Sequence, residues 1–211
     1  MKKSYLILGT GLLLSAMYIS GCSGTQSESA AADTTAAFET KPDFGGYASQ
    51  VEHGHHLVTV GGCRDCHTPK IMTPQGPTED TSRELSGHYG NIPVPDVDRK
   101  KMESKGYIVT ADFTSWIGPW GVSFAANLTP DETGTKGWTE DRFINATRNY
   151  VLHGMTGARP LLPPMAMMPV KHYTDDELKA IFAFIQSLKP IKNLVPQPLP
   201  PASAPPAPPA K

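Results

Sequence analysis

The chain has 211 residues, of which 18% are charged, and its formal net charge is −1. This length allows one domain with long extensions, and the near-neutral charge gives no indication of a nucleic-acid partner. Proline (21 residues) and glycine (19 residues) are abundant. We therefore expect a small core with long loops rather than a large and regular one.

Residues 1–21 have the composition of an export signal. Two lysines precede a mostly apolar run that is too short and too interrupted to be read as a membrane span. The run ends at Ile19-Ser20-Gly21-Cys22, which resembles the lipobox of bacterial lipoproteins. This resemblance implies a lipid thioether and an acyl chain on Cys22, which together anchor a protein to a membrane. A soluble export signal and an uncleaved anchor are the alternatives.

The composition of the chain divides the remainder into three parts. Residues 22–43 are rich in small and polar side chains and are expected to form a flexible, lipid-anchored tether. Residues 44–190 are expected to form the folded domain. Residues 191–211 are rich in Pro and Ala and are expected to be a disordered tail. Such a protein would lie in the cell envelope, facing the periplasm or the cell exterior.

Residues 47–60 are predicted to form the first helix of the domain. Gly54 lies on its partial apolar stripe, where a small residue would let another helix approach closely. The helix also carries three neighbouring histidines. A metal site is conceivable there, but an ordinary helix face is the simpler interpretation. The three histidines are His53, His55 and His56.

The pentapeptide Cys-Arg-Asp-Cys-His begins at Cys63 and has the spacing of c-type haem attachment. Cys63 and Cys66 would form thioethers with the two haem vinyl groups, and His67 would bind the iron. A thiol–disulfide redox pair and half of a zinc site are the alternatives. The chain has three cysteines. Assigning Cys22 to lipid and the other two to haem leaves no free thiol in an oxidising compartment.

Residues 68–137 contain many Pro and Gly breakers, and the sequence predicts little regular structure there. A bound macrocycle could serve as the core around which such irregular chain wraps. Within this stretch, residues 96–105 are dense in charge and fit either a short helix or a surface loop. Three aromatic residues are candidates for covering the macrocycle, although ordinary packing explains each of them equally well. They are Trp116, Trp120 and Phe124.

Two further helices are predicted, over residues 138–151 and 174–189. The second begins with a capping box formed by Thr174 and Glu177. It carries a continuous apolar stripe, which we expect to pack across the first helix near Gly54. The expected fold class is all-α, with long Pro- and Gly-rich loops between the helices.

The segment from residue 162 to residue 169 reads Leu-Pro-Pro-Met-Ala-Met-Met-Pro and offers a second axial ligand. A methionine thioether is a soft, neutral ligand that favours Fe(II) and raises the reduction potential. Met165 is the first candidate and Met168 the second. The remaining options are an open site or a histidine ligand. The histidine candidates are His88, His153 and His172.

These features resemble a bacterial mono-haem class I cytochrome c, of the kind associated with membrane-bound dehydrogenases. The resemblance covers about residues 47–190. It implies a small helical fold around one covalent haem c, with His67 and Met165 as axial ligands. In relatives the methionine usually occurs as Pro-x-Met-Pro, whereas here Ala follows Met165 and the Met-Pro pair comes at Met168. The matching stretches are residues 63–69, 120–131, 163–165 and 173–190, together with Trp138.

The resemblance also implies that a proline carbonyl accepts a hydrogen bond from the second ring nitrogen of His67. Such a bond fixes the imidazole tautomer and strengthens the ligand. Pro77 is the candidate, and Pro69 and Pro74 compete with it.

The function that the resemblance implies is single-electron transfer between redox partners in the cell envelope. The partners would be a dehydrogenase or oxidase, or other cytochromes, and the lipid would hold the carrier at a membrane. The protein would not itself be an enzyme, although it could be a subunit of a dehydrogenase complex. The alternative is a peroxidase-like or small-molecule oxidoreductase with an open or displaceable sixth ligand, which needs a distal acid–base residue such as His153.

Overall fold

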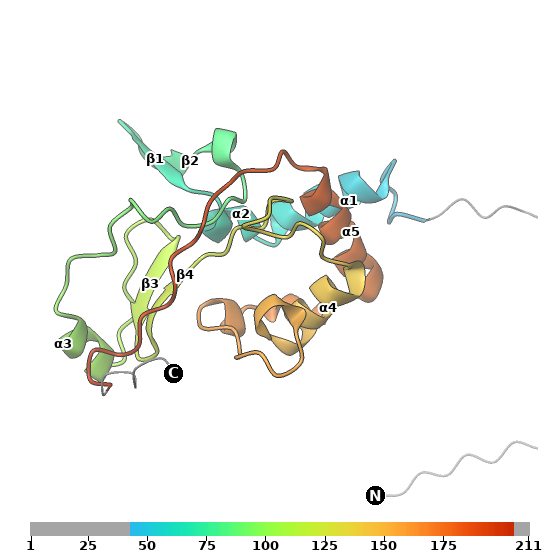
Figure 1. Ribbon diagram of the computed structural model, residues 1–211. Coiled ribbons are helices and arrows are strands. Elements are labelled where there is room, and N and C mark those ends of the chain that lie inside the picture. The colour runs from blue at the N-terminus through green and yellow to red at the C-terminus, as the bar shows by residue number, and fades with distance from the viewer. Residues whose placement is uncertain (1–42, 205–211) are drawn as a thin grey trace, which may run out of the picture. The chain divides into compact units, whose positions relative to one another are not determined.

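Figure 1 shows the computed structural model, in which residues 43–204 are described. The predicted signal segment, Cys22 and nearly all of the predicted tether lie outside these residues, so the expectations about them stay predictions. Within residues 43–204, no helix is long and apolar enough to span a membrane.

The described chain contains both helices and strands. The α-helices are α1 (Gln50–Val60), α2 (Cys63–His67), α3 (Arg99–Ser104), α4 (Glu140–Asn149) and α5 (Asp175–Ser187). The strands are β1 (Lys70–Thr73), β2 (Gly76–Glu79), β3 (Ser115–Gly118) and β4 (Gly121–Phe124). Short 3₁₀ helices complete the chain. η1 (Thr81–Arg83) follows β2, and η2 (Leu152–Gly154) follows α4. η3 (Met165–Met167) and η4 (Pro169–His172) precede α5.

The prediction of an all-α fold is wrong, because two antiparallel hairpins lie in the stretch where the sequence predicts little regular structure. One pairs β1 with β2 and the other pairs β3 with β4. Each strand has four residues, which is too short for an alternating pattern to stand out. All four residues of β3 are buried, so that strand has no alternation at all. The fold is a mixture of helices and small sheets.

The hairpin turns are made by glycines with left-handed backbones. Gly76 begins β2 with φ of 111°, and Gly121 begins β4 with φ of 97°. L-residues with a side chain rarely adopt such angles. Gly121 also lets the backbone at Leu199 lie close to β4, since a Cβ atom on Gly121 would lie 2.1 Å from the carbonyl oxygen of Leu199.

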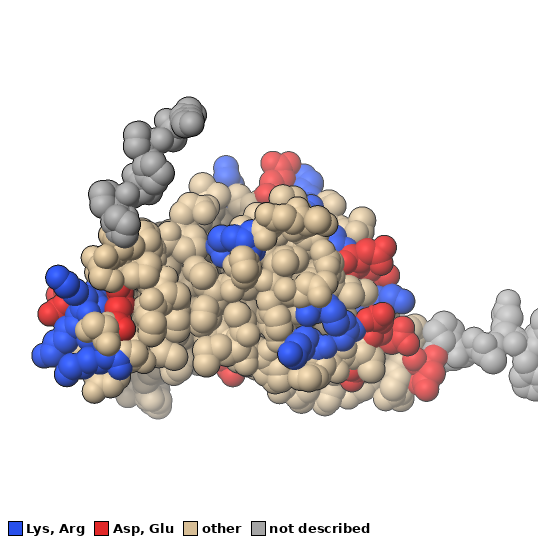
Figure 2. Space-filling view, turned by 90° about the horizontal axis from the view of Figure 1, so that it is seen from below, with Lys and Arg blue, Asp and Glu red and all other residues tan. Residues whose placement is uncertain are grey.

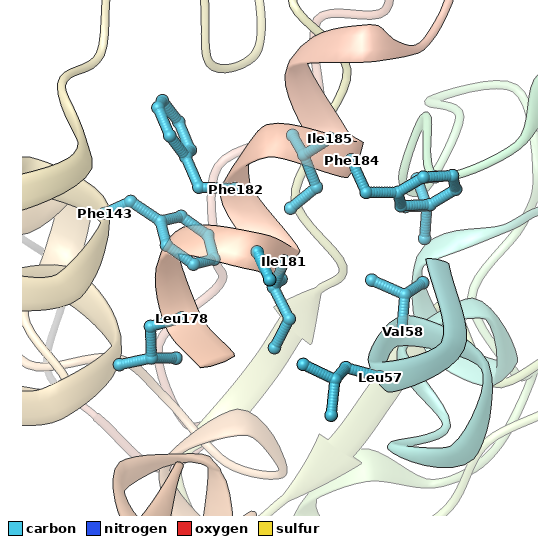
Figure 3. Close-up of a cluster of buried hydrophobic side chains, with 10 residues drawn as sticks. Leu57, Val58, Phe143, Leu178, Ile181, Phe182, Phe184 and Ile185 are labelled. Atoms are coloured by element: carbon cyan, nitrogen blue, oxygen red, sulfur yellow. The ribbon is translucent and has the colours of Figure 1, made fainter. Parts of the chain in front are cut away.

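Helices α1 and α5 form the hydrophobic core, as the stripe on residues 174–189 predicts. The capping box of α5 is present, with Thr174 accepting from the backbone of Glu177 and the Glu177 side chain accepting from the backbone of Thr174. Figure 3 shows side chains from both helices pointing toward one another, with Phe143 of α4 beside Phe182. Burying each large side chain contributes about 1.5–3 kcal/mol. The buried cluster comprises Leu57, Val58, Leu85, Phe143, Leu178, Ala180, Ile181, Phe182, Phe184 and Ile185.

The segment after α5 differs from the predicted disordered tail. Residues 191–204 run back along the β3–β4 hairpin, and Leu199 exchanges two backbone hydrogen bonds with Val122. Asn193 is buried and donates from its side chain to the carbonyl oxygens of Ser86 and His88. The Pro-rich composition suits this extended course, since polyproline-like chain can lie along an edge strand without donating many hydrogen bonds.

Gly54 allows α1 and α5 to cross closely. A Cβ atom on Gly54 would lie 1.9 Å from the carbonyl oxygen of Ala180 and 2.9 Å from the Cβ of Phe184. The nearer of these two atoms belongs to the backbone, so the clash cannot be relieved by rotating a side chain. The two helices would have to move apart, which would open gaps along the apolar seam.

We expect Gly54→Ala to lower the free energy of unfolding by about 2–4 kcal/mol, from overpacking at the helix crossing. Urea denaturation followed by circular dichroism measures this difference. Gly90→Ala is the matched control, because a Cβ atom there meets only the Pro196 ring, at 3.6 Å. Equal stability of the two variants would contradict the close crossing.

Candidate haem site

Two glycines turn the chain sharply from α1 into α2 and so position the Cys-Arg-Asp-Cys-His motif. Gly61 ends α1, and a Cβ atom there would clash with the hydroxyl of Tyr173. Gly62 is the N-cap of α2 and has a left-handed backbone with φ of 67°. Cys63, the first thiol of the motif, therefore follows α1 after only two glycines.

Lys70 holds the other end of α2. Its Nζ donates to the carbonyl oxygens of Asp65 at 2.8 Å and Thr68 at 2.6 Å. A cation at this end interacts favourably with the partial negative charge of the last helical carbonyls. This role of Lys70 was not predicted, and its signal in the sequence is a lysine three residues after the motif.

His67 is oriented by the backbone on both of its sides. Its Nδ1 lies 2.8 Å from the carbonyl oxygen of Ala126. Because a carbonyl only accepts, Nδ1 carries the proton and Nε2 keeps its lone pair free. The carbonyl of His67 itself accepts from the backbone N–H of Gly87 at 2.8 Å. Burial lowers the pKa of His67, and the hydrogen bond to Ala126 opposes that shift.

The predicted partner of His67 is therefore wrong, since the carbonyl belongs to Ala126 and not to Pro77. Pro77 lies in β2, opposite Met72 in the β1–β2 hairpin. Ala126 follows β4, and the preceding residue, Ala125, forms backbone hydrogen bonds with Thr114 and His88. The resemblance covers residues 120–131, which contain Ala126, but a backbone acceptor has no side-chain signal in the sequence.

A large cavity, of about 230 Å³, lies beside α2 and reaches into the hydrophobic core. The predicted haem ligands from both parts of the chain line it: Cys63, Cys66 and His67 from α2, and Met165 from η3. Its other walls are mainly aliphatic and aromatic. They include Val58, Leu85, Leu128, Trp138, Phe143, Leu178, Ile181 and Ile185.

Two of the three methionines in the segment 162–169 face this cavity. Met165 and Met168 line it, whereas Met167 does not and has 66% of its surface exposed. Met165 is half-buried, and Met168 is 37% exposed. The structure therefore brings both predicted methionine candidates to the same cavity as His67.

Side chains from β4 and from the end of α4 hold the methionine segment. The Ser123 hydroxyl donates to the carbonyl oxygen of Pro163 at 2.6 Å and accepts from the Trp120 indole at 3.1 Å. The Tyr150 hydroxyl donates to the carbonyl oxygen of Met168 at 2.5 Å. These bonds fix the backbone on both sides of Met165.

The chain that follows the methionines is braced to α4. Arg148 of α4 donates to the carbonyl oxygens of Lys171 at 2.6 Å and Tyr173 at 2.7 Å, and it forms an ion pair with Asp175. Arg148 thus ties α4 to the stretch that leads from the methionines into α5. An arginine can do this because its guanidinium offers five donors in a fixed fork.

The histidine alternatives to methionine differ in where they lie. His153 lines the cavity, whereas His88 and His172 do not. His88 is buried behind β3 and β4, with Nδ1 2.8 Å from the Thr114 hydroxyl, and burial lowers its pKa.

Two of the three aromatic candidates for covering a macrocycle lie in the cavity wall. Trp116 and Phe124 line it, from β3 and β4. Trp120 does not line it and supports Ser123 instead, through its indole N–H. Two of the three candidates therefore line the cavity, the third supports the methionine segment, and their role in covering a macrocycle stays a prediction.

The histidines of α1 are engaged in aromatic contacts. The ring of Tyr47 stacks on His53 with centroids 5.0 Å apart and lies 5.1 Å from His56. His55 packs against Phe184 at 5.0 Å. Within residues 43–204, no group of three or more His, Cys, Asp or Glu side chains is placed to hold a metal ion. The described chain therefore supplies no second ligand pair for a zinc site at the two thiols.

The two thiols are half-buried, and their pKa values are raised. Both are free, and burial raises the pKa of Cys63 to about 11, with the neighbouring Cys66 adding to the shift. Burial also raises the pKa of Cys66. Redox-active Cys-x-x-Cys pairs have the opposite property, because a lowered pKa keeps the attacking sulfur ionised. The environment thus disfavours a thiol–disulfide role.

The residues that line the cavity fit a haem. The walls are apolar, as the faces of a macrocycle require, and two thiols stand beside a histidine whose Nε2 is free. A thioether donor, Met165, reaches the same cavity from another part of the chain. Nitrogen and sulfur donors of this kind are the axial ligands found in c-type cytochromes.

The chain is distantly similar to a subunit of the nicotinate dehydrogenase of Pseudomonas putida. The two are 23% identical over 159 residues, or 74% of the chain, and the chain spans about a tenth of the length of that relative. No protein-family model matches the chain. The similarity associates the chain with dehydrogenase subunits, in agreement with that part of the sequence-based resemblance.

We expect Ser123→Ala to lower the free energy of unfolding by about 1–3 kcal/mol, because it leaves the Pro163 carbonyl and the Trp120 indole without partners. The amides of residues 162–168 should exchange with solvent faster, as measured by hydrogen–deuterium exchange. Ser187→Ala is the control, since that exposed hydroxyl donates only to the Phe184 carbonyl. Unchanged exchange at 162–168 would show that Ser123 does not hold the methionine segment.

Proposed function

We propose that the protein is a membrane-anchored c-type cytochrome that carries single electrons as a partner or subunit of a dehydrogenase. One observation carries the proposal: Cys63, Cys66, His67 and Met165 line one apolar cavity although they come from two distant parts of the chain. A haem bound there would supply a one-electron Fe(II)/Fe(III) couple.

Cys63 and Cys66 would hold the haem covalently. Each sulfur forms a bond to one vinyl carbon, and the thiol hydrogen goes to the other carbon of that vinyl group, so no oxidant is consumed. His67 would bind the iron through Nε2, because Nδ1 is engaged with Ala126. That hydrogen bond also raises the basicity of the ligand.

Met165 is the better of the two methionine candidates for the sixth position. It is half-buried, whereas Met168 is more exposed and lies where the chain leaves the 3₁₀ turn η3. Ser123 fixes the backbone before Met165, and Tyr150 fixes it after. A preorganised segment of this kind favours a weak Fe–S bond, since little backbone freedom is lost when the bond forms.

With both axial positions filled, the site would exchange electrons without binding a substrate. The distant similarity to a dehydrogenase subunit supports a dehydrogenase as electron donor. Three methionines in the region from residue 155 to residue 168 have 37–66% of their surface exposed: Met155, Met167 and Met168. Figure 2, seen from below, shows a largely uncharged surface between patches of charge. Exposed methionines are adaptable contacts and suit a transient redox partner.

The lipobox resemblance supports anchoring through Cys22, in the cell envelope. Covalent c-type haem is attached outside the cytoplasm, so export and haem attachment require the same compartment. Anchoring would confine the carrier to a membrane surface and raise its effective concentration near membrane-bound partners.

His153 gives the enzyme alternative a specific test, because it lines the cavity at the open rim. If the sixth position were open, its imidazole could act as a distal acid–base group. Rapid reaction of the purified protein with hydrogen peroxide, together with high-spin ferric iron, would favour a peroxidase-like enzyme over the carrier.

We expect the full chain, exported by a bacterium that matures c-type cytochromes, to carry haem that survives denaturing electrophoresis. The double variant Cys63→Ala/Cys66→Ala should lose all covalent haem, because no other thiol among residues 43–204 lines the cavity. Cys22→Ala is the matched control: it should keep its haem and leave the membrane fraction. Absence of covalent haem from the unmodified protein would refute the proposed function.

We expect Met165→Ala to abolish the weak near-infrared charge-transfer band of methionine-ligated ferric haem. The reduction potential should fall by roughly 0.1–0.3 V, within the ~0.8 V range that axial ligands cover. Met168→Ala is the control and should keep both the band and the potential. The reverse result would move the ligand to Met168, and loss in neither variant would exclude methionine ligation.

A further inference from the structure

The cavity is apolar except at one corner, where basic groups from two segments meet. Among the described residues that line it, Arg159 is the only one of the four charged types, Asp, Glu, Lys and Arg. His153 lines the cavity beside it, and both residues are exposed at the rim. Arg159 can keep its charge at this exposed rim, and an anionic group of a ligand at the same rim would be attracted to it.

The basic corner has no acidic counterpart in the described chain. Within residues 43–204, Arg159 forms no ion pair, and its only side-chain hydrogen bond goes to the carbonyl oxygen of Pro160, at 2.9 Å. Arg142 is likewise without an ion pair in this range; it lies 4.5 Å from the centre of the Trp138 ring and donates to the carbonyl oxygen of His153 at 2.8 Å. The corner therefore has a surplus of positive charge.

The titration of His153 agrees with this surplus. Burial lowers its pKa, and the positive charges of Arg142 and Arg159 lower it further. Burial, which is the larger cause, and the two cationic neighbours therefore both favour the neutral imidazole. A ligand that matches the whole cavity would be large and flat over most of its area and anionic at one edge.

We propose that Arg159 binds the carboxylates of the haem propionates. The rim around His153 would form the other side of this anion site. This inference rests on the proposed function. In a haem the two propionates lie on the edge opposite the two vinyl groups, so a propionate site must lie away from Cys63 and Cys66. Arg159 follows α4 and η2 in the chain, so it lines the cavity from a part of the fold other than α2.

The guanidinium of Arg159 suits this role better than a lysine would. It offers a planar fork of donors that matches a carboxylate in two parallel hydrogen bonds. η2 and the short turn after it fix the position of the side chain: Leu152 accepts from Met155 and donates to the carbonyl oxygen of Arg159, at 2.9 Å. Val151 pairs with Pro160 in an isolated β-bridge, so the backbone of Arg159 is anchored on both sides.

The experiment compares Arg159→Gln with Lys171→Gln in the haem-loaded full-length protein. Lys171 is an exposed cation in η4 that does not line the cavity, so its loss controls for long-range charge. Arg159→Gln should lower the ratio of reduced to oxidised protein at a fixed potential by about threefold or more, because an uncompensated carboxylate disfavours Fe(II). Lys171→Gln should change it much less, and Arg159→Lys should restore most of the ratio.

The second readout is the propionate-bending band in the resonance Raman spectrum, which responds to hydrogen bonding at the carboxylates. It should shift in Arg159→Gln and stay in place in Lys171→Gln. Equal potentials in the two variants, or an unmoved Raman band, would overturn the assignment of Arg159. Haem content is measured first on the same samples. Absence of covalent haem in the unmodified protein would instead overturn the proposed function.

Discussion

The hydrogen bond between His67 Nδ1 and the carbonyl oxygen of Ala126 is the contact on which the site depends. It joins the short helix α2 to the chain that leaves β4, and it leaves the Nε2 lone pair of a residue that lines the cavity free to bind a metal. The same two stretches meet at Gly87, where a Cβ atom would lie 2.6 Å from the backbone of Ala126. The small β3–β4 hairpin thus has a functional consequence, since it places a backbone acceptor where the imidazole needs it.

The second constraint is the crossing of α1 and α5, which supplies one wall of the cavity. The residues of this crossing that face the cavity include Val58, Ile181 and Ile185, which also belong to the hydrophobic core. Core and binding site are therefore continuous. A macrocycle in the cavity would bury the remaining apolar walls, so binding and folding would be coupled as they are in metal-dependent domains.

The sequence predicts the helical part of this structure well and the remainder poorly. The capping box at Thr174, the stripe of α5 and the role of Gly54 are local or periodic signals, and all three are present. The predicted helix over 138–151 is observed as Glu140–Asn149. These signals can be recognised in the sequence because helix propensity and capping act between residues a few positions apart.

The features that the sequence does not reveal are those made by backbone atoms or by distant pairs. The two hairpins consist of four-residue strands in a Pro- and Gly-rich stretch, and the all-α expectation fails there. The acceptor of His67 is a carbonyl, which any residue could provide. The ordered course of residues 191–204 depends on Asn193 reaching Ser86 and His88, a pairing across more than half of the domain. A Pro-rich composition predicts extended chain and gives no indication of this long-range pairing.

On the methionine side of the site, short hydrogen bonds to the backbone could hold a weak ligand in place. The Fe–S bond expected for Met165 is intrinsically weak, whereas Ser123, Tyr150 and Arg148 donate hydrogen bonds of 2.5–2.7 Å to carbonyls on the segment between residues 163 and 173. Those bonds come from β4 and from α4 and its C-cap, which belong to the same fold that positions His67. The two candidate ligands, His67 and Met165, are thus held by one scaffold rather than by the short sequence motifs alone. A shift in the β3–β4 hairpin would disturb Ala126 and Ser123 together, and with them the positions of both candidate ligands.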